Sequence, residues 1–133
     1  MHRLDFLDRY TPYALGLLRI VAALIFMEHG MQKLFGFPGA MPPGVPAFII
    51  WVAGPLELFG GILVMIGLAT RPVAFVLSGL MAFAYWMGHG AKGIAEGAPL
   101  PAQNGGELAV IYCFLFLFIS ARGSGIWSVD GGS

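Results

Sequence analysis

The chain has 133 residues, of which 58% are hydrophobic and only 11% charged, and its formal net charge is zero. A water-soluble domain usually carries about 25% charged residues, so this composition and the mean hydropathy of +0.81 argue against a soluble enzyme and against disorder. The balanced charge and the lack of a basic run exclude a nucleic-acid-binding surface. The single cysteine, Cys113, excludes a disulfide framework and a cysteine zinc site.

Four apolar segments are long enough to cross a bilayer as helices, because about 20 apolar residues span its roughly 30 Å hydrocarbon core. They cover residues 13–35, 45–68, 72–88 and 105–121. Short connections rich in glycine and proline join them, so consecutive helices should be antiparallel neighbours. The sequence therefore predicts an all-α fold, an integral membrane four-helix bundle, in a single domain over residues 1–133.

The first segment begins like a signal peptide, with basic residues before an apolar run. Arg19 interrupts that run, and polar residues stand where a cleavage site needs small ones. We therefore expect a retained helix in which Arg19 extends to the nearer membrane surface. Four arginines against two lysines place both termini in the cytoplasm by the positive-inside rule. The two sets are Arg3, Arg9, Arg71 and Arg122 on one side, and Lys33 and Lys92 on the other.

Short strings shared by the two halves of the chain suggest an internal repeat. The first and third segments both end in a His-Gly pair followed closely by a lysine, at His29 and His89. The second and fourth segments both carry a glutamate near their start, Glu57 and Glu107, and both close with an arginine. Two repeated helical hairpins would explain this pattern, and chance matching in a glycine-rich apolar chain is the alternative.

The repeat would place four titratable side chains at one depth. His29, His89, Glu57 and Glu107 lie roughly 21–26 Å along their helices from the inner ends, at 1.5 Å per residue, in the outer third of the membrane. Charged groups at such depth are costly and usually face a bundle interior or a water-filled cavity. Because four helices can direct side chains to one central point, these four residues are the candidate catalytic residues.

Glu28 and Gln32 lie one turn apart near the end of the first segment, and we expect them to complete a ligand pocket. Histidine and glutamate could hydrogen-bond a quinone head group and exchange its protons. They could instead bind a divalent metal, but no compact ligand motif is present and we expect none. They could also serve only to join helices. Glu107, three residues after Asn104, could act only in a helix-capping box.

Longer strings in these regions resemble the DoxX family, small four-helix bacterial membrane proteins related to the DoxD subunit of thiosulfate:quinone oxidoreductase. The strings are Leu18-Arg19, 29–36, 54–61, 67–71, 104–108 and 123–130. The resemblance implies a membrane-bound oxidoreductase, or a subunit of one, in the bacterial cytoplasmic membrane. It also implies quinone as electron acceptor and a soluble or membrane-bound redox partner protein.

The sequence thus favours a quinone-linked oxidoreductase subunit embedded in the lipid bilayer. His29 and His89 would hydrogen-bond the ligand or exchange protons with it, while Glu57 and Glu107 would orient the histidines and accept protons. With one cysteine and no haem or flavin fingerprint, no electron path within the chain alone is visible. A small proton-coupled transporter and a non-enzymatic membrane scaffold for a partner enzyme remain alternatives, and a homo-oligomer is compatible with all three.

Overall fold

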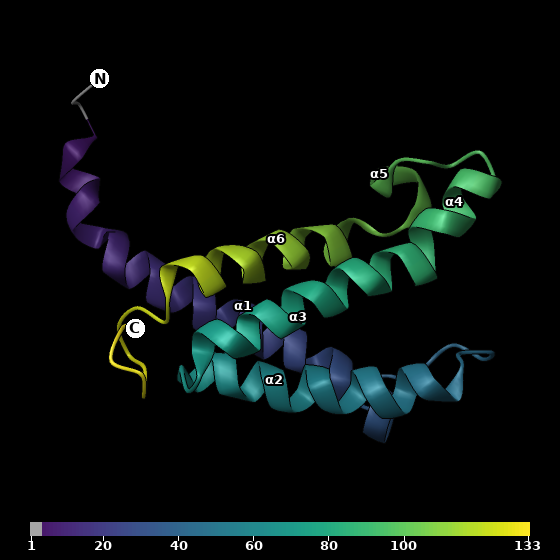
Figure 1. Cartoon of the computed structure of the whole chain (residues 1–133), viewed down its shortest axis with the longest axis horizontal. Coiled ribbons are helices and arrows are strands. Elements are labelled where there is room, and N and C mark those ends of the chain that lie inside the picture. Colours follow the sequence, from purple (N-terminus) through teal and green to yellow (C-terminus); the bar gives the residue numbers. More distant parts are fainter. Residues whose placement is uncertain (1–3) are drawn as a thin grey trace.

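The structure is a computed structural model that describes residues 4–133, and every regular element in this range is helical (Figure 1). The first half contains η1 (Asp5–Tyr10, a 3-10 helix), α1 (Thr11–Phe35), η2 (Ile49–Ala53, a π-helix) and α2 (Gly54–Ile66). The second half contains α3 (Thr70–Tyr85), η3 (Trp86–Gly90, a π-helix), α4 (Ala91–Ala95), α5 (Pro101–Asn104) and α6 (Glu107–Arg122). The predicted all-α class is confirmed for the described residues.

Three continuous helical stretches are long and apolar enough to cross a membrane: Asp5–Phe35, Ile49–Ile66 and Thr70–Ala95. They correspond to the first three predicted segments, although the third runs further than expected. The fourth predicted segment forms α6, whose 16 residues rise only about 24 Å, less than the roughly 30 Å of a hydrocarbon core. The four-helix membrane bundle is therefore supported for three crossings, and the crossing by α6 stays a prediction.

The long helices pack as two pairs. α1 lies along α2 and α3 lies along α6, and α2 also contacts α3 (Figure 1). Glycines allow the first pair to approach closely. A Cβ atom on Gly30 would clash with the backbone of Leu58, and one on Gly61 would lie 2.7 Å from the Cβ of Met27. This pairing agrees with the two hairpins that the repeat pattern predicts.

Aromatic side chains join the two pairs where they cross. The ring of Phe26 on α1 lies 5.2 Å from that of Tyr112 and 4.8 Å from that of Phe116, both on α6. The Tyr112 hydroxyl also donates a 3.1 Å hydrogen bond to the carbonyl of Ala22 on α1. Packing and hydrogen bonds drive helix association in a membrane, where there is no hydrophobic effect between helices. These contacts therefore hold the two pairs together.

η1 and the last residues of the chain lie at one end of the bundle, here named the terminal end (Figure 1). The 36–48 connection and α4–α5 lie at the other end, named the loop end. A C-terminal segment, residues 123–133, closes the terminal end. Arg19 is fully buried there and donates hydrogen bonds to three of its carbonyls, those of Ser124, Ile126 (2.9 Å) and Trp127 (2.7 Å). The expectation that Arg19 extends to the membrane surface was wrong, because this segment supplies acceptors inside the fold.

Asp130 attaches the same segment to α3. Its carboxylate oxygens accept hydrogen bonds from the backbone N–H groups of Ala69 (3.0 Å) and Thr70 (2.8 Å), so it caps the N-terminus of that helix from a distant point in the chain. Its own N–H donates to the carbonyl of Gly67, 2.8 Å away. The hydrogen bond from the Thr70 backbone holds the pKa of Asp130 below its usual value.

Candidate functional site

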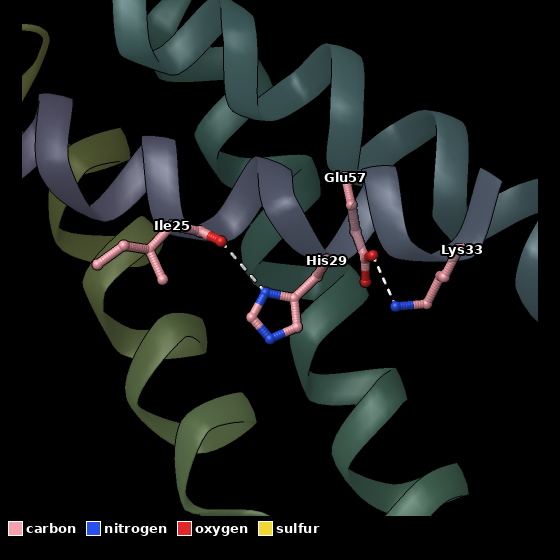
Figure 2. Close-up of polar contacts among 4 residues, drawn as sticks. All are labelled: Ile25, His29, Lys33 and Glu57. Carbon is pink, nitrogen blue, oxygen red and sulfur yellow. Dashed lines mark hydrogen bonds and ion pairs between the residues drawn. The ribbon is translucent and has the colours of Figure 1, made fainter. Parts of the chain in front are cut away.

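A largely enclosed ion pair lies near the loop end, between α1 and α2. The ammonium of Lys33 lies 2.7 Å from the carboxylate of Glu57, and the two side chains are only 13% and 4% exposed. The last turns of α1 carry Lys33, and the first turn of α2 carries Glu57, so the antiparallel pairing brings them together (Figure 2). Both residues belong to stretches that can cross a membrane. The pair is thus a buried ion pair, whose breakage would leave one charge uncompensated.

His29 lies beside this pair, one turn before Lys33. Its Nδ1 is 3.3 Å from the carbonyl oxygen of Ile25 on the same helix, and its ring lies on the same side of α1 as the ion pair (Figure 2). His29 is close enough to Glu57 to interact with it electrostatically. We name Lys33, Glu57 and His29 the Lys–Glu–His group. The sequence anticipated the proximity of His29 and Glu57, but the residue that binds the carboxylate is Lys33.

His89 belongs to a second group, on the other helix pair. It lies in the π-helical turn η3, and its Nδ1 is 3.0 Å from the carbonyl oxygen of Asn104. The Asn104 amide donates to the Tyr85 hydroxyl at 3.2 Å, and its side-chain oxygen accepts from the N–H of Gly106 at 3.0 Å. We name Tyr85, His89 and Asn104 the His–Asn–Tyr group. This group fixes the turn from α5 into α6. His89 itself lies in the π-helical turn η3, and such turns are frequent at functional sites.

The other predicted site residues are more open to the surroundings. Gln32 is half-buried and donates to the carbonyl of Ala40 at 3.4 Å, which ties α1 to the connection that follows it. Glu28 and Glu107 are exposed, and neither has a hydrogen-bond or ion-pair partner within residues 4–133. The expected capping box does not form, because Asn104 holds the turn without a bond from Glu107.

The six predicted residues therefore do not meet at one point. Within the described chain, no hydrogen bond or ion pair links the Lys–Glu–His group to the His–Asn–Tyr group. Both groups nevertheless lie toward the loop end, because α1 and α3 end there while α2 and α6 begin there (Figure 1). Within residues 4–133, no three histidine, cysteine, aspartate or glutamate side chains are placed to hold a metal ion together.

Two functional partners were not anticipated from the sequence. The sequence shows that Lys33 lies one turn from His29, but it did not predict that Lys33 would pair with Glu57. Tyr85 was not predicted to be a site residue. Its contact with Asn104 depends on how α4 and α5 fold back over the end of α3, which no local pattern specifies.

Two grooves lie outside both groups. One, of about 390 Å³, runs between α2 and α3 and has apolar walls that include Leu56, Phe59 and Val76. The other, also of about 390 Å³, borders the start of α6 and includes Pro101 and Glu107. Neither contains a residue of the Lys–Glu–His group, so the buried polar contacts belong to a helix interface and not to these grooves.

The chain is similar in sequence to two bacterial proteins. An uncharacterized protein of Haemophilus influenzae is 44% identical over 128 residues, which is 93% of each chain. A Bacillus subtilis protein named "Putative oxidoreductase CatD" is 39% identical over 66 residues, which is 47% of this chain and 49% of its own. No solved structure matches the chain.

A family model also covers most of the helical core. The DoxX model matches residues 14–90, which run from the first turn of α1 to the end of η3. The matched region therefore includes all of the Lys–Glu–His group, as well as His89. It is more than half of the sequence, and the three helical stretches that can cross a membrane lie largely within it. The chain therefore belongs to the DoxX family of membrane proteins.

Proposed function

We propose that this protein is a membrane subunit of an oxidoreductase and that its Lys–Glu–His group binds a quinone head group. The observation that carries the proposal is the buried ion pair of Lys33 and Glu57, 2.7 Å apart between two helices that can cross a membrane. A buried pair gives little net stability compared with apolar residues, so a role beyond helix packing is favoured. The name of the Bacillus relative supports the same reaction class.

The donor groups fit a quinone. A bound quinone supplies the redox chemistry, since two electrons and two protons convert its two carbonyls to hydroxyls. Lys33 has three N–H donors and shares one with Glu57, which leaves others for a carbonyl oxygen. Glu57 holds the ammonium in place and balances its charge. Because Nδ1 of His29 faces the Ile25 carbonyl, Nε2 is the nitrogen that can exchange a proton with a ligand.

The His–Asn–Tyr group is proposed as the second point of proton exchange. The carbonyl of Asn104, and not Glu107, orients the ring of His89. Glu107 is exposed at the start of α6 and would exchange protons with the surface. Gln32 anchors the connection that covers this end. The electrons come from a partner protein, and the chain contributes quinone binding and proton transfer.

The proposal includes an orientation. We place the protein in the bacterial cytoplasmic membrane with α6 as the fourth crossing and both termini in the cytoplasm. Arg9, Arg71 and Arg122 belong to the terminal end, and Lys33, at the loop end, is neutralised by Glu57. Among the described residues, basic side chains are therefore more numerous at the terminal end than at the loop end, which favours the terminal end as the cytoplasmic side. The Lys–Glu–His group then lies toward the outer face.

Quinone binding tests the proposal directly. The protein, purified in mild detergent, would be titrated with short-chain ubiquinone and menaquinone analogues. A double variant, Lys33→Gln with Glu57→Gln, removes both charges while keeping similar volumes. Glu96→Gln is the matched control, because Lys92 and Glu96 form an exposed pair 3.9 Å apart.

We expect at least about tenfold weaker binding in the double variant, equivalent to about 1.4 kcal/mol, and no change in the control. Circular dichroism and gel filtration would show that both variants fold. A folded double variant that binds like the wild type would contradict the proposal. So would a wild-type protein that binds neither analogue, and that result would favour the scaffold or, with substrate-dependent proton flux in liposomes, the transporter.

A further inference from the structure

The outward face of α1 carries an unusual combination of side chains. Leu17, Val21 and Leu24 are 53%, 49% and 41% exposed, and Glu28, the next residue at the same spacing, is exposed as well. Alternating steps of four and three residues place these side chains in one stripe along a helix. We name these four residues the α1 seam.

The α1 seam lies opposite the face by which α1 packs in the bundle. The buried residues of α1 repeat with the same spacing but are offset by about half a turn; they are Leu15, Gly16, Arg19, Ala23, Phe26 and Gly30. An exposed apolar stripe is ordinary on a membrane helix, since lipid covers it. Glu28 is the exception, because acyl chains cannot compensate a carboxylate.

Glu28 lies within the membrane-crossing part of the bundle. It precedes Phe35, the end of α1, by two helical turns, or about 10 Å of rise. Gly61 of α2 packs against Met27, so Glu28 lies at nearly the same level as Gly60. Trp51, 69% exposed at the start of that helical stretch, is therefore about 13 Å nearer the loop end. Exposed tryptophans mark the membrane interface, and Glu28 lies on the bilayer side of it.

Among residues 4–133, no basic side chain forms an ion pair with this carboxylate. Lys33 is bound to Glu57, and Arg19 is enclosed by backbone carbonyls. A second copy packed through the same seam in the same orientation would bring two Glu28 side chains together. Like charges at such a contact are unfavourable. A partner helix that covers the α1 seam must therefore supply a positive charge at the depth of Glu28.

We propose that the α1 seam is the docking surface for a membrane-spanning helix of a different protein, which carries a lysine or arginine at the depth of Glu28. The apolar residues of the seam pack against that helix, and Glu28 forms the ion pair that sets its register and selects it over other helices. This inference goes beyond the quinone proposal and holds whatever ligand the Lys–Glu–His group binds.

A designed transmembrane peptide tests the seam. The probe is a leucine- and alanine-rich helix with one lysine about 10 Å below its outer end, compared with a peptide that has leucine at that position. Both would be labelled and mixed with labelled full-length protein in phosphatidylcholine vesicles, and association measured by energy transfer. We expect the lysine peptide to associate several-fold to tenfold more strongly, in the range of polar contacts between membrane helices.

Variants locate the contact on the protein. Glu28→Gln should remove the preference for lysine, whereas Glu96→Gln should retain it. Leu24→Trp should block association with both peptides, and Val76→Trp on α3, at a residue 52% exposed, should not. Because these side chains are exposed, their replacement is not expected to disturb folding.

Three outcomes would overturn the inference. The first is equal association of the lysine and leucine peptides with the wild-type protein. The second is a lysine preference that persists in Glu28→Gln, which would place the contact elsewhere. The third is energy transfer between two labelled copies of the protein that Leu24→Trp abolishes, since a second copy would then cover the seam.

Discussion

Arg19 on α1 donates a 2.7 Å hydrogen bond to the carbonyl oxygen of Trp127 in the C-terminal segment. The same guanidinium also reaches the carbonyls of Ser124 and Ile126. A buried cation is thus compensated by backbone carbonyls, with a further electrostatic attraction to Asp130 that is not a direct ion pair. The terminal end of the bundle therefore depends on this charge for its structure, whereas the loop end holds the ion pair that we propose to be functional.

Replacement of Arg19 tests this structural role. Arg19→Met should lower the free energy of unfolding by about 3–5 kcal/mol, because it leaves several buried carbonyls without donors. Arg122→Met, at an exposed position on α6, should change it by no more than about 0.5 kcal/mol. Reversible unfolding in mixed micelles measures both. Equal stability of the two variants would show that the C-terminal segment does not depend on Arg19.

Asp130 predicts a dependence of stability on pH. Its pKa is lowered in the folded protein, first by the hydrogen bond from the Thr70 backbone, so its contribution is complete above the ordinary aspartate pKa of about 3.9. This contribution is lost as the pH falls through the lower, folded-state value. Asp130→Asn should therefore flatten the acid side of the stability profile. An unaltered acid slope in Asp130→Asn would refute the linkage.

The helices could be predicted from the sequence, but their polar partners could not. Hydrophobic segment length and the glycine and proline connections located α1, α2, α3 and α6, because these features depend on local composition. The hydrogen-bond acceptors of Arg19 lie more than 100 positions away in the sequence. Such contacts have no local sequence pattern from which they could be predicted. The same holds for Lys33. Its spacing from His29 was visible, but its partner depends on how α1 packs against α2.

Glycine substitutions test the close packing of α1 and α2. Gly30→Ala would place a methyl group against the backbone of Leu58, so the pair must separate and we expect a loss of about 1–3 kcal/mol. Gly79→Ala is the matched control, because a Cβ at that helical position meets nothing within 4 Å. The control should be neutral or slightly stabilising, since alanine favours helix over glycine by about 1 kcal/mol. Similar losses in both variants would contradict the close-packing argument.

The proposed orientation can be checked by cysteine accessibility. In a Cys113→Ala background, Val129→Cys and Glu96→Cys place single thiols at exposed positions of the terminal and loop ends. A membrane-impermeant thiol reagent added to intact cells should label Glu96→Cys and should label Val129→Cys only after lysis. The reverse pattern would invert the orientation. Labelling of both thiols before lysis would mean that the terminal and loop ends lie on the same side of the membrane. In that case α6, which lies between residues 96 and 129, would not cross it.

The Lys33–Glu57 pair allows stability and function to be separated by a double-mutant cycle. Glu57→Leu alone should destabilise the protein by about 3–5 kcal/mol, because it leaves the Lys33 ammonium buried without its partner. Adding Lys33→Met should recover most of this loss, since an apolar pair of similar volume is often neutral or better than a buried ion pair. If the pair serves only to join α1 and α2, the recovered double variant should also bind quinone analogues like the wild type. The proposed function requires the opposite result, a stable double variant that has lost quinone binding. Thermal unfolding and quinone titration of the wild type, of both single variants (Glu57→Leu and Lys33→Met) and of the double variant distinguish the two.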